Sequence, residues 1–98
     1  MAILFTTDNS QLVCAFSGRM DTVSCMEVKA EVITKIKEHA GKVVFDMSAV
    51  DYISSSFLRI CAEVATMAGN EKFSIIKVNA NIKRVFMIAG LVDKLNIT

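Results

Sequence analysis

The chain begins with two short apolar segments joined by a polar turn. AILFTT (residues 2–7) and QLVCAFSG (residues 11–18) flank the sequence DNS. Apolar runs of this length, separated by turn-forming residues, are typical of an antiparallel β-hairpin. The pattern therefore predicts two paired strands at the start of the chain.

After Gly18 the apolar spacing changes from that of a strand to that of a helix. Ser24 and Glu27 have the S-x-x-E spacing of a capping box, in which the two side chains satisfy backbone N–H groups at a helix start. Gly41 can adopt the left-handed conformation that ends a helix. The apolar residues between these signals recur at helical spacing and are Cys25, Val28, Val32, Ile33 and Ile36.

The rest of the chain alternates between apolar runs and helical patterns. KVVFDMS (residues 42–48) is a continuous apolar run, as expected for a strand covered on both faces. FSIIKV (73–78) and DKLNIT (93–98) predict two further strands. Between them, NANIKRVFMIAG (79–90) predicts a helix. Its apolar face comprises Ile82, Val85, Phe86 and Ala89, with Asn79 or Asn81 at its start and Gly90 at its end.

The segment DYISSSFLRICAEVATMAGN (51–70) predicts a helix after three serines. On a wheel of about 100° per residue its apolar arc covers roughly 220°, about twice what a helix on one side of a sheet needs. The excess indicates either packing against a neighbouring helix or contact with a partner protein. The predicted sheet-facing residues are Leu58, Cys61, Ala62, Ala65 and Ala68, and a second stripe contains Phe57, Ile60, Val64 and Met67.

These elements occur in the order ββαβαβαβ. Helices that alternate with buried strands favour one α/β domain over residues 1–98, with a mixed central sheet and helices packed on it. We expect the central strands to be parallel and the first strand to be antiparallel at an edge. The length of 98 residues fits one compact domain.

Composition excludes several classes of protein. Apolar residues make up 53% of the chain, the formal net charge is +1, and no block of like charge reaches four residues. This is not the composition of a disordered chain, and it predicts no nucleic-acid partner. The chain also lacks a signal-peptide pattern and any apolar run of about 20 residues, so we expect a cytoplasmic protein without membrane insertion.

The sequence carries no pattern of a catalytic, metal or cofactor site. Cys14, Cys25 and Cys61 are widely spaced, and the single His39 does not complete a zinc set with them. A serine nucleophile would need His39 beside the three serines, and no elbow motif supports that. Asp21, Asp46 and Asp51 could gather at a loop edge, but carboxylates alone do not make an active site. We therefore predict no enzyme, no metal and no cofactor.

The three serines at the start of the helix predicted within residues 51–70 have two possible roles. A serine just before a helix caps its free N–H groups and contributes about 1 kcal/mol. One cap explains one serine, whereas Ser54, Ser55 and Ser56 follow each other. A serine at a helix start is also open to phosphorylation, which adds nearly two negative charges.

Three blocks of the sequence resemble one family. VVFDMSAVDYISSSFLRI (43–60) resembles the signature of the STAS family, the fold shared by bacterial anti-sigma factor antagonists and the cytosolic ends of sulfate transporters. SGRMD (17–21) is similar to the family's Gly-Glu-Leu-Asp segment, and NANIKRVFMIAGLVDKLNI (79–97) to its closing helix and strand. The likeness covers nearly the whole chain, with the three blocks in the family's order.

This resemblance implies a function in binding. Stand-alone members bind an anti-sigma factor, which is also an ATP-dependent serine kinase, and so release the sigma factor. The kinase phosphorylates the first serine of the family's Asp-Ser-Ser-Gly and thereby breaks the complex. That serine corresponds to Ser55, with Ser56 or Ser54 as alternatives. The residues we expect at the partner surface are Asp21, Ser54, Ser56, Phe57, Ile60 and Met67.

The chain departs from the family pattern at two positions. Ser54 stands where the family has Asp, and Phe57 stands where it has Gly. An alternative function is therefore an accessory subunit of an ABC transport system for lipids or solutes, which binds a protein without a phosphate switch. Sensing of a small molecule or nucleotide ranks below both, because no phosphate loop is present. The sequence indicates no particular oligomeric state.

Overall fold

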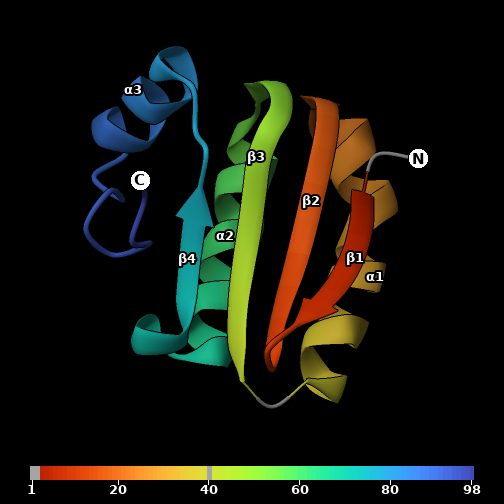
Figure 1. Ribbon diagram of the computed structural model, residues 1–98. Helices are drawn as coiled ribbons and strands as arrows, with labels where there is room; N and C mark the ends of the chain where they lie inside the picture. The colour runs from red at the N-terminus through yellow and green to blue at the C-terminus, as the bar shows by residue number, and fades with distance from the viewer. Residues whose placement is uncertain (1–2, 40) are drawn as a thin grey trace.

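The computed structural model describes residues 3–39 and 41–98 (Figure 1). The elements are β1 (Ile3–Asp8), β2 (Gln11–Met20), α1 (Thr22–Glu38), β3 (Lys42–Ile53), α2 (Ser55–Ala68), the 3₁₀ turn η1 (Asn70–Lys72), β4 (Phe73–Ile76) and α3 (Ala80–Ile88). The predicted element order is confirmed except at the end, where residues 93–98 form only an isolated parallel bridge between Ile97 and Ile75. Ala2, which the prediction includes in the first strand, lies outside the described residues.

The strands form one mixed sheet in the order β1-β2-β3-β4. β1 pairs antiparallel with β2, and β3 pairs parallel with both β2 and β4. Asn9 and Ser10 join the first two strands with φ angles of 49° and 64°. Two positive φ angles in succession are typical of the tight turns whose twist matches that of a hairpin. The predicted hairpin and mixed sheet are therefore confirmed.

Two helices cover the same face of the sheet. α1 and α2 lie behind it in Figure 1, whereas α3 lies beyond the edge formed by β4. The strand β3 is predicted to be covered on both faces, but the helices α1 and α2 cover only one of them (Figure 1). Val43 and Phe45 alternate with Val44 and Asp46, so successive side chains point to opposite faces. Val44 is nevertheless buried on the helix-free face, because it lies on a central strand between β2 and β4.

Four phenylalanines join α2 to the sheet. Phe16 of β2 packs edge-on against Phe45 of β3 with ring centroids 4.8 Å apart, and Phe45 packs in the same way against Phe73 of β4 at 4.9 Å. The Phe57 ring from α2 lies 5.1 Å from Phe16 and 6.2 Å from Phe45. Edge-on pairs at these distances are a favoured aromatic geometry, so this cluster fixes how α2 sits on the sheet.

The residues that begin and end α1 differ from those predicted. The helix begins at Thr22, one turn earlier than the Ser24–Glu27 box implies, and the Asp21 carboxylate caps it by accepting the Ser24 N–H at 2.9 Å. The predicted capping box is wrong because Ser24 already lies inside the helix. The helix ends at His39 in extended backbone, so Gly41 does not supply a left-handed end. Gly41 instead allows a close approach, since a Cβ there would lie 2.5 Å from the Ser10 carbonyl oxygen.

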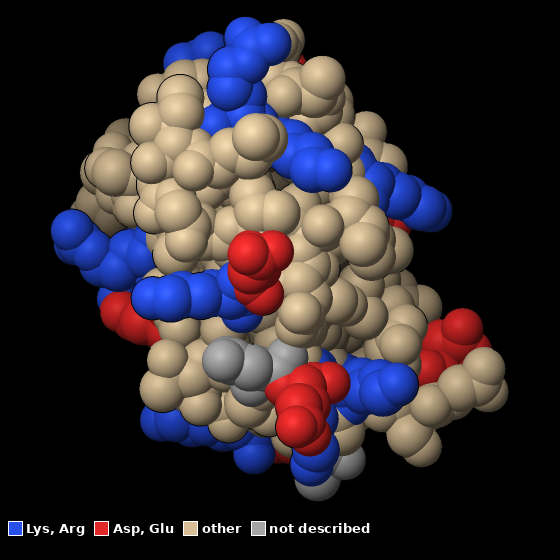
Figure 2. Space-filling model, turned by 90° about the vertical axis from the view of Figure 1, so that its left-hand side faces the viewer, with Lys and Arg blue, Asp and Glu red and all other residues tan. Residues whose placement is uncertain are grey.

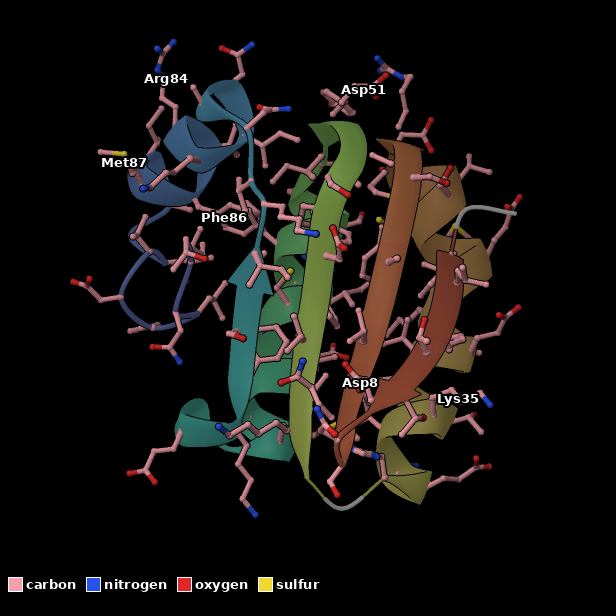
Figure 3. The ribbon with its side chains drawn as sticks, viewed as in Figure 1. Asp8, Lys35, Asp51, Arg84, Phe86 and Met87 are labelled. Carbon is pink, nitrogen blue, oxygen red and sulfur yellow. The ribbon has the colours of Figure 1, made fainter. Side chains whose placement is uncertain are left out.

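α3 begins and ends where the sequence indicates. The Asn79 side chain accepts the Ile82 N–H at 2.9 Å, and Gly90 follows the helix with a φ of 72°. Only part of the predicted apolar face is buried, namely Ile82 and Phe86. Figure 3 shows Phe86 pointing toward the sheet and Met87 pointing away from it. Figure 2 shows the face of the molecule that lies to the left in Figure 1. On this face, positively and negatively charged side chains lie in several groups among uncharged residues.

Candidate functional site

The three helices begin at the same end of the molecule, beyond the carboxyl ends of the parallel strands (Figure 1). Met20 ends β2 just before α1, and Ser54 follows β3 just before α2. The Ser54 N–H donates to the Met20 carbonyl oxygen at 3.0 Å. This bond holds the starts of α1 and α2 close together. In sheets with parallel strands, this end is where binding sites usually form.

Ser54 occupies the N-cap position of α2, but its side chain does not cap the helix. Its hydroxyl donates to the Met20 carbonyl oxygen at 2.9 Å and lies 3.8 Å from the Cys25 sulfur. The hydroxyl therefore fastens α2 to the end of β2 instead of accepting an N–H of its own helix. Of the serines that could cap this helix, Ser54 therefore does not do so with its side chain.

Ser55 is the first residue of α2 and the exposed member of the three serines, whereas Ser54 and Ser56 are half-buried. The expectation that Ser55 lies at the exposed start of this helix is confirmed. Its modification stays a prediction.

A groove runs between α1 and α2 beside Ser56. It encloses about 160 Å³, and its lining residues are Cys25, Met26, Lys29, Ser56, Arg59 and Ile60. Farther along the groove, Lys29 of α1 forms an ion pair with Glu63 of α2 at 3.5 Å. The groove therefore combines an apolar floor with two cationic side chains, one from each helix.

Asp21 lies at the same end of the molecule as the serines. The hydrogen bond from the Ser24 N–H lowers the pKa of the Asp21 carboxyl below its usual range, and the nearby Arg19 acts in the same direction. Asp21 therefore stays charged at neutral pH while capping α1.

The structure changes the predicted partner surface on α2. Phe57 and Ile60 are 0% and 2% exposed, so their side chains belong to the core and not to a surface. Their inclusion among the partner-binding residues is wrong, because Phe57 packs in the aromatic cluster and Ile60 faces α1. Met67 remains 41% exposed. It lies beside Ile36 and His39, at the opposite end of the helix from the serines.

The buried arc of α2 combines both predicted stripes. It contains Phe57, Ile60, Cys61, Val64 and Ala65, which span roughly 140° of the wheel. Among the predicted sheet-facing residues, Leu58 is half-buried and Ala62 is exposed. The neighbouring helix α1 therefore accounts for much of the excess apolar arc.

Sequence reasoning missed two exposed apolar side chains on α1. Val23 is 65% exposed and Met26 is 74% exposed, and Met26 lines the groove next to Ser56. Both lie off the buried stripe that contains Cys25 and Val28. Apolar residues outside the helical repeat were the signal that could have revealed them. Exposed apolar side chains of this kind often mark a protein interface.

A cation and an aromatic ring lie at the same end of the sheet. The Arg19 guanidinium lies 4.3 Å above the centroid of the Tyr52 ring. Arg19 and Tyr52 are the last residues but one of β2 and β3, immediately before α1 and α2. A stacked pair of this kind is common in recognition surfaces.

The candidate residues His39 and Asp46 lie apart from the three serines. His39 lies at the far end of α1 from the serines, and a helix of this length spans about 25 Å. Asp46 is bound to other partners, Ser48 and Lys77. Partial burial raises the pKa of its carboxyl, but the hydrogen bond from the Ser48 N–H and the charge of Lys77 have the larger effect, so this pKa is lowered. Within residues 3–39 and 41–98, no three His, Cys, Asp or Glu side chains are placed to hold a metal ion.

The cysteines are all buried and free. Burial raises the pKa of the Cys14 thiol to about 12 and raises that of Cys61 well above its ordinary value. Burial also raises the pKa of Cys25, against the effect of its contact with Ser54. In the described part of the chain, no helix is long and apolar enough to cross a membrane.

Comparisons with known proteins point to one family. A sequence model of the STAS domain matches residues 2–98. The protein named "Putative anti-sigma factor antagonist BtrV" of Bordetella bronchiseptica is 23% identical over 87 residues, which are 87% of this chain and 75% of that protein.

Solved structures share the fold. An anti-sigma factor antagonist (STAS) domain protein from Planctomyces limnophilus aligns with a TM-score of 0.88 and 17% identity, covering 100% of this chain and 90% of the other. The anti-sigma factor antagonist SpoIIAA in its unphosphorylated form aligns with a TM-score of 0.81 and 14% identity, covering 99% and 86%. The phosphorylated form of SpoIIAA, a Bacillus cell fate determinant, aligns with a TM-score of 0.72 and 13% identity, covering 99% and 91%.

Proposed function

Because this chain belongs to the STAS domain family, we propose that it is an anti-sigma factor antagonist that acts in the cytoplasm by binding and not by catalysis. One observation carries this proposal: Ser55, which the sequence resemblance aligns with the family's modified serine, is exposed as the first residue of α2. The names of BtrV and SpoIIAA support the same function.

The proposed partner is an anti-sigma factor with the fold of an ATP-dependent serine kinase. Its docking surface on this chain is the end of the molecule where α1 and α2 begin. Ser55 and Ser56 lie at its centre, and Asp21, Ser54 and Met26 lie around them. The surface thus combines an exposed apolar side chain with half-buried hydroxyls, and protein interfaces contain both kinds of group.

Phosphorylation of Ser55 would break this complex. The kinase would transfer the γ-phosphoryl group of ATP to the Ser55 hydroxyl oxygen, which loses its proton, and would release ADP. The free protein would tolerate the phosphate, because a helix N-terminus favours negative charge. The interface would not, because it would have to desolvate nearly two charges without a partner.

The test compares three forms of the protein. Candidate anti-sigma factors encoded beside this chain's gene would be titrated by calorimetry with wild type, Ser55→Ala and Ser55→Asp. We expect the alanine form to bind like wild type and the aspartate form to bind at least tenfold more weakly while staying folded. Mass spectrometry after incubation with the kinase and ATP should find one phosphate on wild type and none on Ser55→Ala.

A second function follows if the switch fails. Ser54 and Phe57 replace the family's Asp and Gly, and Phe57 is locked in the core. Equal binding by Ser55→Ala and Ser55→Asp, together with an unmodified wild type, would overturn the switch. Failure of every form to bind an anti-sigma factor would instead favour an accessory subunit that binds an ABC transporter's ATPase subunit through the same surface.

A further inference from the structure

The groove between α1 and α2 contains cations that the proposed interface does not explain. Arg59 lies one helical turn after Ser55 and Ser56, and Lys29 reaches the same groove from α1. On the α2 wheel, Arg59 lies about 40° from Ser55 and about 60° from Ser56. Both serines therefore share a side of the helix with this guanidinium.

We propose that this groove is an intramolecular receptor for the phosphate on Ser55, with Arg59 as its main cation and Lys29 as its second. This inference rests on the proposed function for the phosphate itself. It adds where the phosphate goes once it is attached.

The direction of the Arg59 side chain supports this placement. Long side chains on a helix point back toward its N-terminus, so Arg59 extends over the turn that contains the serines. Residues four apart on a helix surface have Cβ atoms about 5–6 Å apart. A phosphoserine at position 55 is thus within reach of the guanidinium, which binds phosphate through two parallel N–H groups.

The charges around the groove favour binding of a phosphate over the ion pair between Lys29 and Glu63. Lys29 forms an ion pair with Glu63 at 3.5 Å, and both side chains are nearly half exposed. Such a pair contributes at most about 1 kcal/mol, so a doubly charged phosphate can compete for the ammonium. Asp21 lies at the same end and repels a phosphate, but it is held at the start of α1 by its bond to Ser24.

The consequence for regulation is that the phosphate covers part of the docking surface. Held by Arg59, it would lie along the groove beside Met26 and Ser56 instead of projecting into solvent. A partner would then meet an occupied groove as well as a new charge.

The experiment measures the phosphate directly and needs neither kinase nor partner. Phosphoserine is installed at position 55 during translation, and the second ionisation of the phosphate is followed by ³¹P NMR at low salt. Nearby cations stabilise the dianion, so the titration midpoint should be lower in wild type than in Arg59→Gln, by about half a pH unit. Lys29→Gln should give a smaller rise, and Arg59→Lys should keep most of the effect. About 1 M salt should remove most of the difference, because it screens exposed charges.

Arg84→Gln is the matched control. Arg84 is an exposed arginine on α3, away from the groove (Figure 3), so its loss should leave the midpoint unchanged. Circular dichroism verifies that each variant is folded. If Arg59→Gln and Lys29→Gln move the midpoint no more than Arg84→Gln does, the receptor is refuted. That result would leave partner binding untouched, whereas failure to bind an anti-sigma factor would leave this titration unchanged.

Discussion

Phe57 stands at a position where the family pattern has glycine, and replacing it with glycine tests the position of its ring in the fold. The ring is fully buried and contacts the rings of Phe16 and Phe45. If the ring were a surface feature that limits access to the serines, Phe57→Gly would change binding and leave stability alone. If the ring holds α2 on the sheet, the variant must lose stability.

The expected loss follows from the burial of the ring. Truncating a buried phenylalanine to alanine costs about 3–5 kcal/mol, because the removed atoms leave a cavity. Glycine in a helix costs up to about 1 kcal/mol more than alanine. We therefore expect Phe57→Gly to lose about 4–6 kcal/mol, against a total stability of about 5–15 kcal/mol for a typical domain. The melting temperature should fall by at least about 15 °C.

Urea unfolding followed by circular dichroism measures this loss. Phe57→Leu keeps an apolar side chain in the cluster and should cost less than half as much. Tyr52→Ala removes an exposed ring at the same end of the molecule and should cost about 1 kcal/mol or less. A Phe57→Gly protein within about 1 kcal/mol of wild type would refute the role of the ring in holding α2.

Three further predictions test the placement of α2 and the cap of α1. Ala65→Glu should unfold the protein or lower its melting temperature sharply, because it buries an unpaired charge; an unchanged melting curve would contradict the burial of this residue. Met67→Asp should leave the unfolding free energy nearly unchanged because Met67 is exposed, whereas Val64→Asp, at a fully buried position of the same helix, should abolish folding. A large loss of stability in Met67→Asp would instead place Met67 in the core. Asp21 has a lowered pKa in the folded state, so its contribution is present above the unfolded pKa near 4 and is lost as pH falls through the folded pKa. Asp21→Ala should therefore flatten the decline of the urea midpoint below about pH 4, and equal slopes for both proteins would show that this cap does not contribute.

Periodicity was enough to predict most of the fold. The hairpin, the two helices on the sheet and the cap of α3 by Asn79 follow from local spacing, because each depends on residues close together in the sequence. The bare face of the sheet could not be predicted in this way. The run from Val43 to Phe45 reads as buried on both sides, but Val44 is buried without a helix over it.

Some features of the candidate site could likewise be predicted from the sequence, and others could not. The exposure of Ser55 follows from its place at a helix start. The bond from the Ser54 hydroxyl to the Met20 carbonyl could not be predicted, because it joins residues 34 positions apart. The resemblance also led to the wrong prediction that Phe57 lies at the partner surface. Its ring packs against phenylalanines from the strands, and these residues come together only in the folded protein.

The three buried thiols make the folded protein a convenient host for chemical labelling. Only the thiolate attacks maleimides and similar reagents, and a thiol with its pKa near 12 supplies almost none of it at neutral pH. A cysteine introduced at position 55 would therefore be the fast-reacting sulfur, with no need to remove Cys14, Cys25 or Cys61. A dye attached there would report on the end of the molecule where α1 and α2 begin. Labelling of the buried Cys14 and Cys61 would need the fold to open, so this background signal would report how often the fold opens.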